Sequence, residues 1–185
     1  MVLSYIYRDL CLQHLSSSLQ SGENGENTSQ PLEHKEAFFD QDFLANVQKI
    51  LDTSIQEPVM IQTKITELLQ ENPEDEIPYY LKNFFDKRTT EDIDAEYVLK
   101  MLKAFPTFKQ EVEKAVNEFT ETFSFQQMDV LDQSIFLLWY TEWKEIETPK
   151  EILINEVVEL GKRYSDDGSP KLLNGIMHKI LNAIK

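Results

Sequence analysis

The residue types that most often catalyse reactions or bind metals are few in this chain, and they are not grouped. Its three histidines, His14, His34 and His178, have no second histidine, cysteine or acidic residue at a recognised metal-ligand spacing. The single cysteine, Cys11, lies among apolar residues and has no second cysteine for an internal disulfide. No glycine-rich phosphate loop and no nucleophile elbow occurs. We therefore expect no metal, no cofactor, no catalytic residue and no small-molecule substrate.

Acidic side chains are abundant enough that their pairing carries no information about catalysis. The chain has 33 Asp and Glu residues against 18 Lys and Arg residues, which gives a formal net charge of −15. Adjacent carboxylates arise readily in such a composition, so no acid/base pair is assigned. A small hydrolase would need two acidic side chains that converge in a deep pocket. The chemistry of the residues alone predicts a helical binding protein.

The charge is unevenly distributed along the chain. Residues 1–127 contain 11 basic and 23 acidic residues, whereas residues 128–185 contain 7 and 10. From Leu160 onward five basic residues face only two acidic ones, and they are Lys162, Arg163, Lys171, Lys179 and Lys185. A local basic surface on an acidic protein is one interpretation of this end, and ordinary solvated helix faces are the other.

The length and the apolar pattern predict one all-helical domain over residues 1–185. The chain has only 5 glycines and 7 prolines, and apolar residues recur at spacings of three and four. Its longest apolar run, from Ile135 to Tyr140, is far shorter than the roughly 20 residues of a membrane-spanning helix. The first residues lack the positive region of a secretory signal, so we expect a cytoplasmic protein.

The first two thirds of the chain contain several separate helical patterns. An amphipathic helix is predicted from residue 2 to about residue 19, and a flexible polar loop at about residues 21–34. Further patterns cover residues 38–51 and 61–69, and a shorter one covers about residues 79–85. Thr90 is a predicted N-cap for the next helix, and Pro106 is predicted to interrupt or kink it before a further helix.

Three helices are predicted in the last third. Residues 128–144 are apolar around almost the whole helix circumference at their centre, so this helix should be buried among the others. Thr148 and Glu151 predict a capping box around Pro149 at the start of the next helix. Ser169 and Pro170 predict a second cap followed by a proline.

The order of residues in this last third resembles the NusB family of transcription antitermination factors, mainly over residues 131–185. The matching residues are Leu131-Asp132-Gln133-Ser134-Ile135-Phe136, Glu142, Pro149, Ile154-Asn155-Glu156-Val157-Val158-Glu159-Leu160-Gly161-Lys162-Arg163-Tyr164 and Ser169-Pro170-Lys171-Leu172-Leu173-Asn174-Gly175. A weaker similarity covers the first helix, at Arg8-Asp9-Leu10-Cys11-Leu12-Gln13-His14-Leu15.

This resemblance implies an all-α fold, a NusB-like helical bundle of two packed small helical subdomains. It implies a non-enzymatic function: binding of boxA-type RNA together with ribosomal protein NusE, in the transcription elongation complex that synthesises ribosomal RNA. Carried over residue by residue, it points to Asp132 as a contact with a basic partner protein and to five RNA-binding residues, which are Arg8, Gln13, Ser169, Lys171 and Asn174. Asn155 and Glu156 are interpreted as maintaining the fold.

The chain also differs from the family pattern. Residues 1–7 contain no Lys or Arg where the family has a basic arm, and Leu137 occupies the position of a family arginine. An acidic insert occupies about residues 71–108. Fewer neutralised phosphates mean weaker RNA binding. The alternative hypothesis is therefore a divergent NusB-fold protein-interaction module that has lost RNA binding. In that case Ser169 is a helix cap, and Asn174 ties the last helix to its neighbour.

Overall fold

The computed structural model describes residues 1–21, 58–70, 72, 74–75, 78, 91 and 93–183. These residues form six α-helices, one 3-10 helix and no strand, which confirms the predicted all-α class. The elements are α1 (Val2–Ser21), α3 (Pro58–Leu69), α5 (Ala95–Phe119), η2 (Phe125–Gln127), α6 (Val130–Glu145), α7 (Lys150–Tyr164) and α8 (Ser169–Ala183). Beyond Ser21 the predicted loop lies outside the described residues, as do the helical pattern at residues 38–51 and most of residues 71–93.

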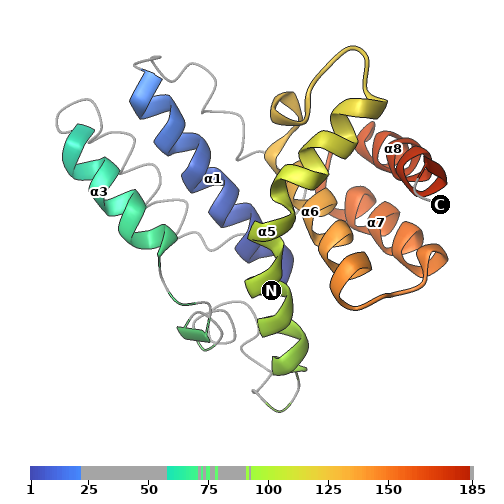
Figure 1. Ribbon diagram of the computed structural model, residues 1–185, viewed down its shortest axis with the longest axis horizontal. Coiled ribbons are helices and arrows are strands. Elements are labelled where there is room, and N and C mark those ends of the chain that lie inside the picture. The colour runs from blue at the N-terminus through green and yellow to red at the C-terminus, as the bar shows by residue number, and fades with distance from the viewer. Residues whose placement is uncertain are drawn as a thin grey trace.

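The helices are arranged around α1, α5 and α6. Helix α1 lies between α3 on one side and α5 and α6 on the other, and α7 and α8 lie side by side at the far end of the bundle (Figure 1). Leu12 and Leu15 of α1 pack with Ile61 and Ile65 of α3 in a small hydrophobic cluster. The other apolar residues of α1, among them Ile6, belong to the large cluster that α5, α6, α7 and α8 share. Helix α1 thus contributes side chains to both clusters.

Helix α6 is the central helix that its apolar composition predicts. It contacts α1, α5, α7 and α8, and Trp139 at its middle is only 1% exposed. Two of its buried polar side chains have partners inside the protein: the Gln133 amide donates to the Met128 carbonyl at 2.8 Å, and the Ser134 hydroxyl donates to the Val130 carbonyl at 2.6 Å. The Thr141 hydroxyl and the Trp139 indole nitrogen are also buried, and neither has a hydrogen-bond partner among the described residues. Burial of polar groups is tolerated because these hydrogen bonds replace those to water.

Helix α5 is not interrupted at Pro106, and its N-cap is a residue that the sequence pattern does not indicate. It runs without interruption from Ala95 to Phe119, with Pro106 inside it. Proline removes one backbone hydrogen bond, but Phe105 and Val112 on either side of it are both buried, and this packing keeps the segment helical. Its N-cap is Asp94, whose carboxylate accepts a hydrogen bond of 2.9 Å from the Tyr97 amide. Thr90, the predicted cap, lies outside the described residues.

The starts of α7 and α8 lie where the prolines place them, but neither predicted cap forms. The Thr148 hydroxyl donates to the Glu142 carboxylate at 3.1 Å, and the N-cap position of α7 is Pro149, which has no side-chain cap. Ser169 is the first residue of α8 and not its cap, since its hydroxyl donates to Asp132 at 2.7 Å. In both cases the hydroxyl donates to a carboxylate of α6, and it does not cap the helix that follows it in the sequence.

Candidate functional site

Helices α7 and α8 approach each other closely at Gly161. A Cβ atom added at this glycine would lie 3.0 Å from Cδ1 of Leu173 and 3.4 Å from Cα of Pro170. A side chain at this position would therefore push the two helices apart. The absence of a side chain at Gly161 fixes the spacing of α7 and α8, and a groove opens beside this contact.

The groove between α7 and α8 has a volume of about 450 Å³. Its apolar lining residues, Ile154, Val158 and Pro170, are partly buried. The polar residues that line it are Asn155, Glu159 and Lys162 from α7 and Lys171 and Asn174 from α8. All of these polar residues are exposed except Asn174, which is partly buried. The groove thus combines an apolar surface with amide and ammonium groups.

Three of these polar side chains have no partner within the described part of the chain. Lys162 donates to the Glu159 carboxylate at 2.6 Å, so these two charges compensate each other. By contrast, no hydrogen bond or ion pair to a described residue engages the side chains of Asn155, Lys171 or Asn174. Two amides and one ammonium group are therefore available to a ligand.

Behind the groove, Asp132 joins α6 to both helices. This residue is 3% exposed, and its carboxylate accepts hydrogen bonds from Ser165 at 2.6 Å and from Ser169 at 2.7 Å. Burial raises the pKa of the Asp132 carboxyl above its ordinary value, and the two serine hydroxyls partly oppose this shift. Ser169 is 8% exposed, so its hydroxyl points into the protein. This network positions the first turn of α8.

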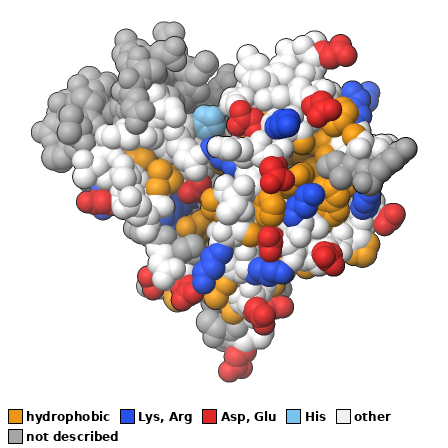
Figure 2. All heavy atoms as spheres, viewed as in Figure 1, with side chains coloured by type: hydrophobic (Ala, Val, Ile, Leu, Met, Phe, Trp, Pro, Cys, Tyr) orange, Lys and Arg blue, Asp and Glu red, His pale blue; other side chains and the backbone are white. Residues whose placement is uncertain are grey.

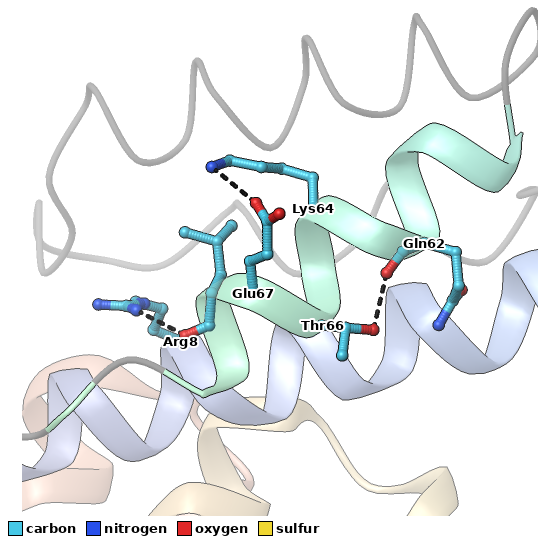
Figure 3. A network of polar contacts seen from close by, with 6 residues as sticks. Arg8, Gln62, Lys64, Thr66 and Glu67 are labelled. Carbon is cyan, nitrogen blue, oxygen red and sulfur yellow. Dashed lines mark hydrogen bonds and ion pairs between the residues drawn. The ribbon is translucent and has the colours of Figure 1, made fainter.

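Arg8 lies on α1, away from the groove. Its guanidinium donates to the Leu68 carbonyl near the end of α3 at 3.4 Å, a contact that Figure 3 shows together with Lys64 and Glu67 of α3. The guanidinium carbon also lies 5.6 Å from the centre of the Tyr5 ring. In this arrangement Arg8 connects α1 to the free carbonyls at the C-terminus of α3.

Gln13 belongs to a polar cluster between α1 and α5. Its amide nitrogen donates to the Asp9 carboxylate at 2.5 Å, and its amide oxygen accepts a hydrogen bond from Lys109. Burial raises the pKa of Asp9, although the Lys109 charge opposes the shift, and burial lowers the pKa of Lys109 against the attraction of Asp9. Like Arg8, Gln13 does not line the groove.

The structure therefore brings together only part of the site that the sequence predicts. Lys171 and Asn174 share the groove, whereas Ser169 and Asp132 are buried behind it. Asn155, interpreted from the sequence as maintaining the fold, is exposed and lines the groove instead. The recurrence of groove residues along α7 at positions 154, 155, 158, 159 and 162 is the helical spacing that could have revealed this face.

The surface around the bundle has mixed charge. On the face that Figure 2 shows, Lys and Arg side chains are interspersed with Asp and Glu, and apolar side chains lie between them. Within the described ranges, no three His, Cys, Asp or Glu side chains are grouped so that they could hold a metal ion. None of the helices described above is long and apolar enough to cross a membrane.

Comparison with known proteins identifies the family. The model of the NusB family matches residues 59–182. The transcription antitermination protein NusB of Lactococcus lactis is 26% identical over 147 residues, which cover 74% of this chain and 77% of that protein. Its namesake in Clostridium novyi is 28% identical over 112 residues, covering 59% of this chain and 84% of the relative. No solved structure matches the chain. Because the family model spans well over half of the sequence, the chain belongs to the NusB family.

Proposed function

We propose that this protein is a cytoplasmic transcription antitermination factor that binds boxA-type RNA together with ribosomal protein NusE, within the elongation complex that synthesises ribosomal RNA. The observation that carries the proposal is the position of Lys171 and Asn174. Both lie in the part of the chain that the family model matches, and both face an open groove with their polar atoms unpartnered by any described residue. The proposed role is binding, with no catalytic step and no cofactor.

Lys171 supplies the electrostatic part of this function. Its ammonium group is exposed and has no carboxylate partner among the described residues, so it is available to a phosphate of single-stranded RNA. Each phosphate that a lysine neutralises releases condensed counterions, which makes binding weaken as salt increases. One lysine that contacts one phosphate changes the slope of log K against log salt by about 0.7 on a single strand.

The remaining predicted contacts have internal partners. Arg8 and Gln13 stay proposed RNA contacts, but each would have to share or exchange the hydrogen bonds it makes to Leu68 and to Asp9 and Lys109. Ser169 would act indirectly, because its hydroxyl bond to Asp132 holds the first turn of α8, which carries Lys171. Asp132, being buried, would influence a basic partner such as NusE through the position of α8.

The test is a titration of fluorescently labelled boxA RNA, followed by anisotropy, with this protein alone, NusE alone and both together. We expect the mixture to bind more tightly than either component. In the mixture, Lys171→Gln should make the negative slope of log K against log salt shallower by about 0.7, the value for one phosphate contact on a single strand. Lys179→Gln is the matched control, because Lys179 lies on α8 outside the groove and donates to the Phe119 carbonyl. Equal binding by the mixture and by NusE alone contradicts the proposal.

The second candidate function is a protein-interaction module that keeps the fold without RNA binding. The net charge of −15 and the interspersed charges in Figure 2 favour it, because both weaken attraction to phosphates. Purification of the protein with its partners from native cells separates the two functions. A protein complex that is insensitive to salt and contains no RNA would favour the interaction module.

A further inference from the structure

We propose that the groove between α7 and α8 holds one unstacked nucleotide of the RNA, and that Asn155 and Asn174 together contact the edge of its base. The inference rests on the proposed function and deepens it. It assigns one wall of the binding site to α7, where neither the sequence nor the family resemblance places an RNA contact. It also changes the role of Asn155 from maintaining the fold to recognising a base.

The size and lining of the groove suit a single nucleotide. Its volume of about 450 Å³ lies within the roughly 300–1,000 Å³ of pockets that bind small molecules of this size class. Ile154, Val158 and Pro170 provide an apolar surface on which the face of a base can rest. Proteins that read single-stranded RNA bind bases that are splayed out of the stack, with apolar contact to the face and hydrogen bonds to the edge.

The two asparagine side chains supply the hydrogen bonds. Each amide has two donors and one acceptor oxygen, so it can match the mixed donor and acceptor pattern of a base edge. Asn155 comes from α7 and Asn174 from α8, so they approach the groove from its two walls. Neither amide has a hydrogen-bond partner among the described residues, so a base would not have to displace an internal contact.

The charges around the groove favour a nucleotide over a free base. Lys171 has no carboxylate partner in the described ranges and lies beside Asn174 in the lining, where it can meet the phosphate. Glu159 would repel a phosphate, but its carboxylate is paired with Lys162 at 2.6 Å. The net effect in the groove is one uncompensated positive charge next to two amides and an apolar surface.

Three variants and a matched control test this arrangement. Asn155→Ala and Asn174→Ala should each weaken boxA RNA binding in the presence of NusE by about 3- to 10-fold, the loss of one or two hydrogen bonds. They should leave the salt slope unchanged, because they remove no charge, whereas Lys171→Gln should reduce it. Asn182→Ala is the control, since Asn182 is exposed on α8 and does not line the groove, and it should bind as the wild type does. Thermal unfolding of all variants confirms that they remain folded.

A scan with abasic RNA identifies the nucleotide. At one position of the RNA, removal of the base should weaken binding to the wild-type protein. The Asn155→Ala/Asn174→Ala double variant should bind this abasic RNA as tightly as it binds the intact RNA. Such coupling is expected only when these side chains and that base touch.

Different failures have different meanings. If RNA binds to the wild type with NusE and the two asparagine variants bind equally well, the groove inference is overturned and the proposed function stands. If the side-chain amide NMR signals of Asn155 and Asn174 shift on addition of NusE without RNA, the groove is a protein-binding site and the inference also fails. If the wild type with NusE binds no RNA, both the proposed function and this inference are overturned.

Discussion

Asp132 of α6 and Ser169, the first residue of α8, are joined inside the protein by a hydrogen bond of 2.7 Å. The other oxygen of the same carboxylate accepts a hydrogen bond of 2.6 Å from Ser165, at the end of α7. One buried carboxylate therefore holds the end of one groove helix and the start of the other. The geometry of the groove depends on Asp132 although this residue does not line it.

Replacement of Asp132 should destabilise the protein. Asp132→Ala leaves the hydroxyls of Ser165 and Ser169 buried without their partner, so we expect it to lower the free energy of unfolding by about 2–4 kcal/mol. Asp132→Asn should cost less, because an amide can still bond to both hydroxyls. Urea unfolding followed by circular dichroism measures both. His178→Ala, an exposed change on α8, is the control, and a loss for Asp132→Ala no larger than that of this control would refute the prediction.

The stabilisation that involves Asp132 should depend on pH. Burial raises the pKa of this carboxyl above its ordinary value of 3.8, which applies to the unfolded chain. Between the two pKa values the folded protein retains a proton that the unfolded chain has released, so the contribution to stability is complete below 3.8 and falls as pH rises through the folded pKa. The free energy of unfolding of the wild type minus that of Asp132→Asn should therefore decrease with rising pH and then level off. A difference that does not change with pH would contradict this.

Gly161 and Gly175 should respond to substitution in opposite ways. Gly161→Val places a side chain against Leu173 and Pro170, and we expect a loss of about 1–3 kcal/mol from overpacking. Gly175 lies within α8, and an added Cβ would meet nothing within 4 Å. Gly175→Ala should therefore stabilise the protein by about 0.5–1 kcal/mol through helix propensity. Thermal unfolding of both variants tests whether α7 and α8 are packed as closely as the structure shows.

Cys11 should be unreactive in the folded protein. It is 9% exposed, and burial raises the pKa of its thiol to about 12. Because the thiolate is the reactive form, labelling by a disulfide reagent such as DTNB at mildly alkaline pH should be at least about 100-fold slower than in denaturant. Fast labelling under native conditions would show that α1 separates from α5 and α6 far more often than the packing indicates.

The elements that the sequence predicts best are those whose signal is local. Six consecutive apolar residues identify α6 as buried, and Pro149 and Pro170 place the starts of α7 and α8 within about one residue. The predicted caps fail because Thr148 bonds to Glu142, at the end of the preceding helix, and Ser169 bonds to Asp132, which is distant in sequence. Local patterns contain no information about such tertiary partners.

The candidate site is only partly predictable for the same reason. Lys171 is exposed on α8 as a basic residue near a helix start is expected to be, and the family motif identifies it. Asn155 lies on a face of α7 that helical spacing can identify, but only the packing of α8 beside that face shows that it lines a groove. Arg8 matches the family motif in α1, so it is predicted to contact RNA. Its guanidinium donates to a carbonyl of α3, and this contact cannot be predicted from the sequence of α1.

Helix α1 has apolar side chains on two sides, one packed against α3 and the other against α5 and α6. Until these helices are synthesised and pack against it, its apolar side chains are exposed and can promote aggregation. Its partner α6 is translated only after about 110 further residues. At the usual 5–20 residues per second, an uncovered apolar segment persists for about 5–20 seconds on every nascent chain. Ile6 and Leu10 belong to the cluster that includes α6, so they are buried late, whereas Leu12 and Leu15 pack against α3, which is synthesised earlier. The two ends of α1 therefore become buried at different times during synthesis.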